Sequence, residues 1–183
     1  MNPFERLREQ VLVLRYQAGD ANALEELVAR HYGPLLYFIR RMVGDSRSAE
    51  DVLQNTWLAV VRDLRKLRNP EAFSAWLYRI ARNKVYQRLR KRDRVLPLSQ
   101  EVEVTAAPEE TDDFSAEDAA RVHECLERVR PEHREVLVLR FLEQMSYQDI
   151  AAVVGCGLGT VRSRLHYAKR ALRKEMEETD DER

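Results

Sequence analysis

Apolar side chains recur every three or four positions along most of this 183-residue chain, a period that predicts α-helices and few strands. Residues 8–92 contain about four such segments. The stripe of Leu24, Leu27 and His31 is typical of a helix with one buried face. Pro34 suits the first position of a second helix, and Gly44 suits the position after its end. We therefore expect a helix boundary at Pro34.

Capping residues mark two further helix starts. Ser48 and Asp51 form an S-x-x-D pattern ahead of an apolar run. Asn69 and Pro70 combine a cap residue with a proline before a long helical segment. These signals predict where the third and fourth helices begin.

The helical period lapses between residues 93 and 115, where two prolines and several acidic residues replace it. A flexible acidic linker explains this composition best, although the V-x-V alternation at residues 102–104 leaves a short strand open. Helical period resumes after this segment. The predicted fold is therefore all-α, with two small helical domains, residues 1–94 and 115–178, joined by a linker at residues 95–114. Residues 179–183 form an acidic tail.

The second domain carries the signals of a helix-turn-helix. Pro131 opens one helix, and the pair Ser146 and Asp149 caps a short helix after it. Residues 155–157 make a glycine turn, and a long helix follows from Leu158. A short helix, a tight turn and a longer helix are the parts of that motif.

Composition narrows the class of protein. Apolar residues make up 44% of the chain and charged residues 34%, a profile of helix-rich globular proteins. The apolar runs are too short to span a bilayer, and the charged N-terminus does not resemble a secretory signal. Cys125 and Cys156 lie far apart, which is typical of reduced thiols. We expect a cytoplasmic protein without membrane insertion.

The net charge of zero hides an asymmetric distribution. Residues 1–95 carry a formal net charge of +8, residues 96–120 one of −8, and residues 121–178 one of +2. The local clusters, rather than the sum, decide whether a polyanion binds. The sequence therefore remains compatible with a nucleic-acid partner.

The last predicted helix places two kinds of side chain on opposite faces. At about 100° per residue, Val161, Leu165 and Leu172 share a stripe that faces the core. Hydrogen-bonding and basic side chains occupy the remaining surface: Thr160, Arg162, Ser163, His166, Tyr167, Lys169 and Arg170. Such a face can read base edges in the major groove while its cations hold phosphates. A solvated surface face is the alternative, and the preceding short helix and turn favour DNA recognition.

A second basic face belongs to residues 73–92. Between Arg79 and Arg94 the sequence has eight basic residues and one acidic residue. Phosphates attract such cations, and interleaved aromatics and amides can stack on or bond to unstacked bases. The polar members of this face are Arg79, Arg82, Asn83, Tyr86 and Arg90. They lie opposite an apolar stripe of Phe73, Trp76, Leu77 and Ile80. A membrane-surface helix is the alternative, but the stripe continues the core pattern of the preceding helices.

The sequence gives little support to a catalytic site or a metal site. Arg, His and Tyr together occur in DNA-cleaving recombinases, but His166 and Tyr167 are adjacent on one helix here. The candidate zinc ligands His123, Cys125, His133 and Cys156 lack finger-like spacing. We expect a protein that is not an enzyme, with no metal and no cofactor.

Several stretches, in order, resemble the extracytoplasmic-function (ECF) sigma factors of bacterial RNA polymerase. The matching segments are "AEDVLQNTWLAVV", "FSAWLYRIARN" and "LRFLEQMSYQDIAAVVGCGLGTVRSRLHYAKRALR", with a weaker match at "LVLRYQAGDANALEELVARHY". Together they cover about residues 9–176. A lone helix-turn-helix is weakly specific, whereas this ordered set is highly specific.

The resemblance implies a promoter-specificity subunit whose domains are sigma regions two and four. Region two is implied to bind the β′ clamp helices of core RNA polymerase through Asp51, Gln54, Asn55 and Trp57. It is also implied to capture a flipped minus-ten base with Asp63, Leu67, Ile80 and Asn83, beside the basic residues Arg79 and Arg82 and the aromatic Tyr86. Region four is implied to bind the β flap and to read the minus-thirty-five element with the last helix. An anti-sigma factor is a further implied partner.

Three positions depart from the family pattern. Asn55 replaces a common glutamate, Gly157 replaces a frequent proline, and Tyr167 replaces a frequent arginine. The upstream promoter sequence therefore cannot be copied from relatives. A stand-alone helix-turn-helix repressor or activator is the main alternative, and a helical adaptor for acidic proteins is another.

Overall fold

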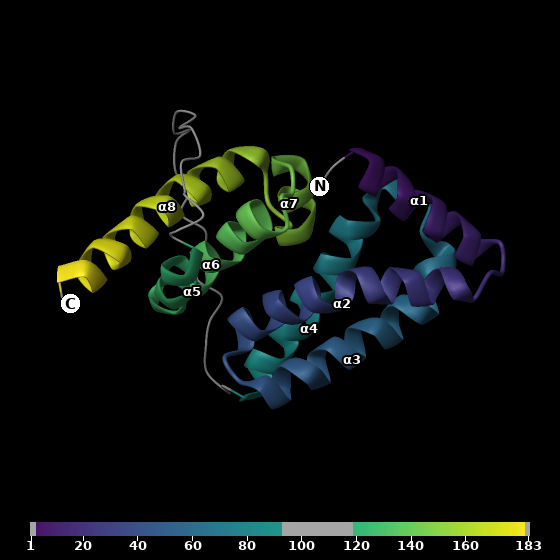
Figure 1. Cartoon of the computed structure of the whole chain (residues 1–183), viewed down its shortest axis with the longest axis horizontal. Helices are drawn as coiled ribbons and strands as arrows, with labels where there is room; N and C mark the ends of the chain where they lie inside the picture. The colour runs from purple at the N-terminus through teal and green to yellow at the C-terminus, as the bar shows by residue number, and fades with distance from the viewer. Residues whose placement is uncertain (1–2, 93–118, 182–183) are drawn as a thin grey trace.

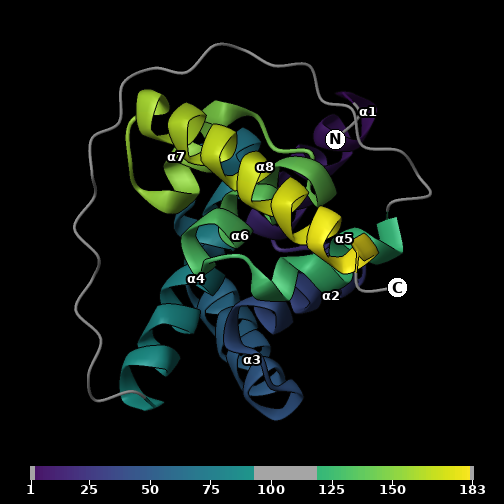
Figure 2. The same cartoon turned by 90° about the vertical axis from the view of Figure 1, so that its left-hand side faces the viewer.

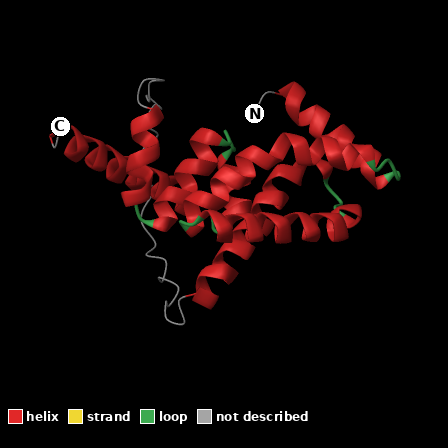
Figure 3. Cartoon of the chain, turned by 60° about the horizontal axis from the view of Figure 1, so that its bottom comes forward, coloured by secondary structure: helices red, strands yellow, loops and turns green. Residues whose placement is uncertain are grey.

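The computed structural model describes residues 3–92 and 119–181, which form helices and connecting turns without a strand (Figure 3). The prediction of an all-α fold is confirmed for these residues. The predicted linker at residues 95–114 lies outside them. The helices gather into two units, α1–α4 and α5–α8, which lie side by side (Figure 1).

The N-terminal unit is a bundle in which α2 is the central helix. Its elements are α1 (Pro3–Gln17), α2 (Asn22–Val43), α3 (Ser46–Asp63), the 3₁₀ turns η1 (Leu64–Lys66) and η2 (Pro70–Ala72), and α4 (Phe73–Arg92). The core side chains Leu27, Phe38, Val60 and Phe73 are fully buried. Burying a side chain of this size stabilises the fold by about 1.5–3 kcal/mol.

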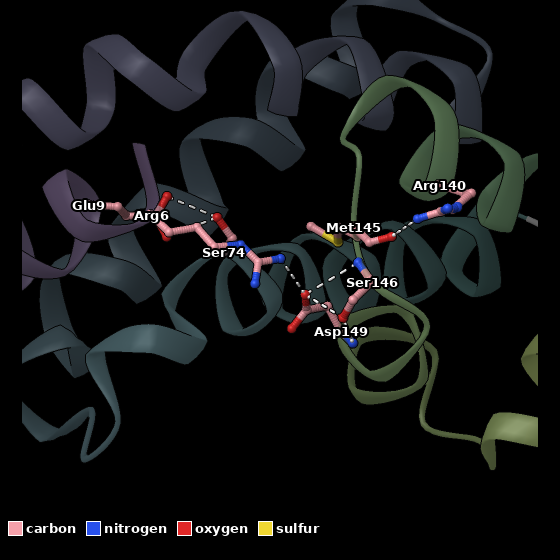
Figure 4. Close-up of polar contacts among 7 residues, drawn as sticks. All are labelled: Arg6, Glu9, Ser74, Arg140, Met145, Ser146 and Asp149. Atoms are coloured by element: carbon pink, nitrogen blue, oxygen red, sulfur yellow. Dashed lines mark hydrogen bonds and ion pairs between the residues drawn. The ribbon is translucent and has the colours of Figure 1, made fainter. Parts of the chain in front are cut away.

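A buried polar contact fixes α1 to this bundle. The Ser74 hydroxyl of α4 donates to both carboxylate oxygens of Glu9, at 3.0 and 2.9 Å (Figure 4). His31 Nε2 of α2 lies 2.8 Å from the same carboxylate. Glu9 is only 2% exposed, so these partners offset the cost of burying its charge.

The C-terminal unit contains the predicted helix-turn-helix. Its elements are α5 (Ala119–Arg128), α6 (Pro131–Leu137), the π-helical turn η4 (Val138–Leu142), α7 (Tyr147–Val154) and α8 (Leu158–Asp181). The long α8 packs against α5, α6 and α7 (Figure 2). Its stripe of Val161, Leu165, Ala168 and Leu172 is buried, as the period predicted.

Two of the predicted helix boundaries are wrong. No boundary occurs at Pro34, because α2 continues through it to Val43. Pro34 is exposed while His31 and Leu35 on either side are buried, so the missing N–H lies on the solvent side and the buried stripe continues. The third helix begins at Ser46 with Asp45 as its cap, because the Asp45 carboxylate accepts from the Ser48 N–H at 2.7 Å.

The remaining capping predictions are confirmed. The Asn69 side chain accepts from the Glu71 N–H before α4. Pro131 occupies the first turn of α6. Ser146 and Asp149 form a reciprocal capping box at the start of α7. Gly155 ends α7 with φ of 77°, a left-handed conformation that glycine adopts without strain.

Polar contacts join the two units along α4, α2 and α1. Arg6 of α1 donates to the Asp149 carboxylate at 3.1 Å, beside the α7 capping box (Figure 4). Helix α4 packs on α7, and α2 packs on α6. The structure therefore brings one face of the basic helix against the C-terminal unit.

Candidate functional site

A pocket lies where the end of α3, the turn η1 and helix α4 meet. Four of the sequence-predicted residues line it: Asp63, Leu67, Ile80 and Asn83. Its volume is about 520 Å³, large enough for a planar base. The side chain of Trp76, which the sequence assigns to the apolar stripe, adds an aromatic wall. The structure thus joins residues that are 20 positions apart in the sequence into one concave surface.

The chemistry of this pocket combines apolar walls with polar groups at its edge. Arg62 donates to the Asp63 carboxylate at 2.7 Å, and Lys66 donates to it at 3.3 Å. The hydrogen bond from Arg62 lowers the pKa of Asp63, so this carboxylate is ionised at neutral pH. Asn83 is exposed and offers both an amide donor and an acceptor.

Cations surround the pocket mouth. Arg62, Lys66, Arg68 and Lys84 all line it, and none of them was singled out from the sequence. The basic run at residues 62–68 was the available signal. A ring of cations around an aromatic pocket attracts a phosphate backbone and leaves room for a base.

Arg82 and Tyr86 lie away from this pocket. Arg82 Nε donates to Glu135 Oε1 of α6 at 2.7 Å, and its guanidinium lies 4.6 Å from the centre of the Tyr86 ring. Burial raises the pKa of Tyr86 to about 12. Burial also raises the pKa of Glu135, and Arg82 opposes that shift. The structure therefore divides the predicted basic face of α4 into two parts. Arg79 and Asn83 are exposed, whereas Arg82 and Tyr86 are half-buried and Arg82 bonds to the C-terminal unit.

A second groove lies between α2 and α3. Gln54 and Trp57 line it, and its volume is about 470 Å³. Asp51 and Asn55 are exposed on the same helix, where the Asn55 amide donates to the Asp51 carbonyl at 2.7 Å. All four predicted polymerase-binding residues therefore lie on α3, with two in the groove and two beside it.

Sequence reasoning missed the apolar part of this groove. Tyr32, Leu58 and Val61 line it and are 48%, 62% and 47% exposed. The available signal was that Val60 and Val61 are adjacent on one helix, so both cannot face the core. Exposed large apolar side chains that gather in one groove are typical of a protein-binding surface.

Helix α8 presents part of the predicted DNA-reading face. Arg162, Tyr167 and Arg170 are exposed, and Thr160 and His166 are half-buried. The His166 and Tyr167 rings lie edge to face, with centroids 5.3 Å apart. These residues leave guanidinium, imidazole and phenol groups accessible along the helix.

Ser163 and Lys169 do not fit the exposed face that the sequence predicts. Ser163 is 3% exposed, and its hydroxyl donates to the Thr160 carbonyl at 3.1 Å within the same helix. Lys169 is 5% exposed, because its side chain folds back until the ammonium lies 5.6 Å from the centre of the Phe141 ring. Helical period therefore predicted neither the folding of the long Lys169 side chain onto a neighbouring element nor the burial of Ser163, whose angular position is opposite the core stripe.

Among residues 3–92 and 119–181, no group of three His, Cys, Asp or Glu side chains could hold a metal ion. None of the helices within these ranges combines the length and apolar character of a membrane span.

Comparisons with known families agree with this geometry. The family described as sigma-70 region 2 matches residues 27–95, and the family described as sigma-70 region 4 matches residues 119–172. The first match covers the base-sized pocket and the α2–α3 groove, and the second covers the helix-turn-helix. Both units of the structure therefore correspond to parts of a sigma-70-type transcription factor.

Similar full-length proteins narrow the class. The RNA polymerase sigma-H factor of Pseudomonas aeruginosa is 35% identical, over 93% of this chain and 94% of its own length. The ECF RNA polymerase sigma-E factor of Escherichia coli is 34% identical, over 92% of this chain and 94% of its own length. The chain belongs to the ECF sigma factors of RNA polymerase, as the sequence resemblance predicted. A stand-alone helix-turn-helix regulator is not favoured.

Solved structures show the same architecture. CnrH in complex with the cytosolic domain of CnrY matches with a TM-score of 0.68 and 27% identity, over 93% of this chain and 97% of that chain. The sigma factor RpoE of Bartonella quintana, in complex with the anti-sigma factor NepR, matches with a TM-score of 0.66 and 25% identity. This match covers 84% of this chain and 96% of that chain. The arrangement of both helical units is thus shared with sigma factors.

Proposed function

We propose that this sigma factor binds core RNA polymerase, recognises a promoter through two elements and helps to melt the DNA. In this proposal residues 1–94 act as region two, residues 95–114 as a linker and residues 115–178 as region four. The observation that carries it is the pocket lined by Asp63, Leu67, Ile80 and Asn83, in a chain of the ECF family. An ordinary repressor has no need of a cavity for an extruded base.

Base capture follows from the chemistry of the pocket. Extruding a base from the duplex costs a few kcal/mol. Stacking of a base on an aromatic side chain returns about 1–3 kcal/mol, and Trp76 supplies such a surface. Asn83 would bond to the edge of the base, Asp63 would accept from an exocyclic amine, and the surrounding cations, with Arg79, would hold the phosphates. Arg82 and Tyr86 would join once the C-terminal unit has moved.

Core polymerase binding is assigned to the α2–α3 groove. We place Asp51, Gln54, Asn55 and Trp57 there, and we add the exposed Leu58 and Val61. Such a groove fits the helices of the β′ clamp, because apolar side chains at its centre and polar groups at its rim suit a helical partner. The C-terminal unit is assigned to the β flap.

A substitution in the groove tests this assignment. Leu58→Ser should leave the free protein folded, since Leu58 is 62% exposed, and should weaken core binding about tenfold or more because an apolar contact is lost. Leu14→Ser is the matched control, since Leu14 is 53% exposed on α1 outside the groove. Equal affinities of the two variants for core polymerase, measured by fluorescence anisotropy, would remove the groove from the interface.

Upstream recognition is assigned to α8. Arg162, His166, Tyr167 and Arg170 would enter the major groove, with Thr160, Ser163 and Lys169 adjoining the contact. Arginines can donate to guanine or phosphate, and the Tyr167 ring suits a thymine methyl group. The side chain of Lys169 would have to swing away from Phe141 to reach a phosphate.

The remaining properties follow from the same role. We infer that the protein is not an enzyme and needs no cofactor, and that it acts in the cytoplasm, where the polymerase and the chromosome are. An anti-sigma factor is a proposed partner, because a similar sigma factor was solved in complex with one.

Run-off transcription tests the proposal. The full chain is added to core RNA polymerase on a promoter library with randomised upstream and minus-ten elements. We expect transcripts from a defined subset only when both chain and core are present. Binding of duplex promoters by the chain alone, with no effect on initiation by core, would instead support a stand-alone regulator.

A further inference from the structure

The C-terminal end of α1 lies against η1, the turn that carries part of the base-sized pocket. Gln17 is the last residue of α1, and its Nε2 donates to two backbone carbonyl oxygens of this turn. The bond to Leu64 is 3.1 Å long and the bond to Leu67 is 2.8 Å long. The preceding Tyr16 hydroxyl donates to the carbonyl oxygen of Val61 at 3.4 Å. Two neighbouring side chains of α1 therefore bond to the backbone of the segment that joins α3 to α4.

The Gln17 amide is not needed to complete its own helix. The Ala18 N–H donates to the Leu14 carbonyl at 2.9 Å. The Gly19 N–H donates to the Tyr16 carbonyl at 3.0 Å, so backbone groups close the end of α1. Gln17 is half-buried, and ordering its flexible side chain costs conformational entropy. The two bonds across to η1 offset that cost.

The backbone of η1 depends on this support. The Leu67 N–H donates to the Leu64 carbonyl at 3.1 Å, but a three-residue 3₁₀ turn has poorer hydrogen-bond geometry than an α-helix. Leu67 is already extended, with φ of −67° and ψ of 110°. The buried Leu64 side chain anchors the turn in the core, but apolar packing is non-directional and does not orient carbonyl groups. Because Gln17 bonds at both ends of the turn, it fixes the backbone between residues 64 and 67.

This segment forms one wall of the pocket. The lining residues that it supplies are Asp63, Lys66, Leu67 and Arg68. Hydrogen bonds weaken steeply when donor and acceptor are misaligned, so the position of this wall relative to α4 determines which base edge fits. Gln17 does not line the pocket itself. It acts on the pocket through the backbone of the turn.

We propose that Gln17 is a positioning residue for base capture. By bonding to the Leu64 and Leu67 carbonyls, it sets the wall of the pocket that selects the extruded base. This inference rests on the proposed function, because it assigns the pocket to a base of the minus-ten element. It adds α1 to the elements that determine promoter specificity, although no residue of α1 lines the pocket.

Three variants test this role. Gln17→Met keeps a similar length and a good helix former but has no N–H to donate. Gln10→Met is the matched control, because Gln10 lies about two turns earlier on the same side of α1 and is also half-buried. Gln17→Lys is the rescue variant, since its ammonium restores donors for both carbonyls.

The measurement uses holoenzyme assembled from core polymerase and each full-length variant. The captured position is the minus-ten base whose identity matters most in run-off transcription with the wild type. Fluorescence anisotropy gives the affinity for single strands that differ only at this base. Wild type and Gln10→Met should share one base preference. Gln17→Met should lose about three- to tenfold of it, and Gln17→Lys should keep most of it. Core affinity should be the same for all of these proteins.

Two results would overturn the positioning role. One is the same base preference in Gln17→Met as in Gln10→Met. The other is a loss in Gln17→Lys as large as in Gln17→Met, because the donors would then not be what sets the pocket. Failure of the proposed function looks different, since wild-type holoenzyme would then bind all the strands equally. Unchanged circular dichroism and core affinity show that a lost preference does not come from unfolding.

Discussion

The two candidate DNA-binding surfaces of this sigma factor are built in different ways. The pocket combines residues from α3, η1 and α4 and is open in the structure. The reading face of α8 comes from a single helix, and two of its predicted members, Ser163 and Lys169, are buried. A surface that several elements build together has its shape fixed by the core. The accessibility of a surface on a single helix depends instead on how its long side chains fold and on which elements pack beside them.

The largest expected effect concerns the pocket. Asn83→Ala should reduce transcription from duplex promoters about tenfold to a hundredfold, because hydrogen bonds worth about 1–3 kcal/mol to the captured base are lost. Transcription from a template with the minus-ten region already unpaired should decrease much less. Gln87→Ala, at an exposed amide of the same helix outside the pocket, is the control. Equal losses on both templates would show that Asn83 has no part in melting.

The second effect concerns the α8 face. Tyr167→Arg supplies a bidentate donor at an exposed position, so preference should shift toward guanine at one upstream base pair. The discrimination should change by about 1–3 kcal/mol. A randomised upstream element, scored with holoenzyme containing either protein, measures the shift. An unchanged preference at every position would mean that Tyr167 does not contact bases.

A smaller effect separates exposed from buried cations on α8. Arg170 is exposed and Lys169 is buried beside Phe141. Arg170→Ala should weaken promoter binding evenly across sequences and reduce the salt slope by about one. Lys169→Ala should change the slope less if its ammonium stays over the ring. A larger loss for Lys169→Ala would show that this side chain swings out on binding DNA.

The smallest effect reports how closely the C-terminal unit covers α4. Since burial raises the pKa of Tyr86 to about 12, its phenol should remain protonated at about pH 10.5, where an exposed tyrosine is mostly ionised. A tyrosine pKa that is raised in the folded protein contributes to folding stability below about pH 10. This contribution is lost as the pH rises toward 12. Difference absorbance at about pH 10.5 should therefore be nearly the same for Tyr86→Phe and wild type. A clear loss of phenolate absorbance in Tyr86→Phe would mean that Tyr86 is exposed in solution.

Much of the fold was predictable from local sequence, because its signals act over a few residues. The capping box of Ser146 and Asp149 and the glycine turn at Gly155 depend on neighbouring backbone groups alone. The prediction at Pro34 was wrong because a helix tolerates a proline more easily where the missing N–H lies on the solvent-facing side, as it does in α2. At Ser48, a better cap three residues earlier, Asp45, took the role, and the Ser48 hydroxyl instead accepts from Arg88 at 3.0 Å.

The candidate site was predictable only in part. Family resemblance grouped Asp63, Leu67, Ile80 and Asn83, and all four line one pocket. The helical period of the sequence placed Arg82 and Tyr86 on the basic face of α4. It could not show that α6 packs against this face, because the Arg82–Glu135 bond joins residues 53 positions apart. Contacts between units depend on tertiary packing, which has no signal in a single helix.

Fluorescence of 2-aminopurine tests base capture most directly. The analogue is placed beside each base of the minus-ten element in turn, in a duplex promoter, and brightens when the neighbouring base that stacks on it is extruded. We predict that holoenzyme with wild-type chain or Gln87→Ala raises the fluorescence at one position, and that Asn83→Ala abolishes most of this rise while core binding is unchanged. An equal rise with Asn83→Ala and wild type at every position would contradict capture of the base in this pocket.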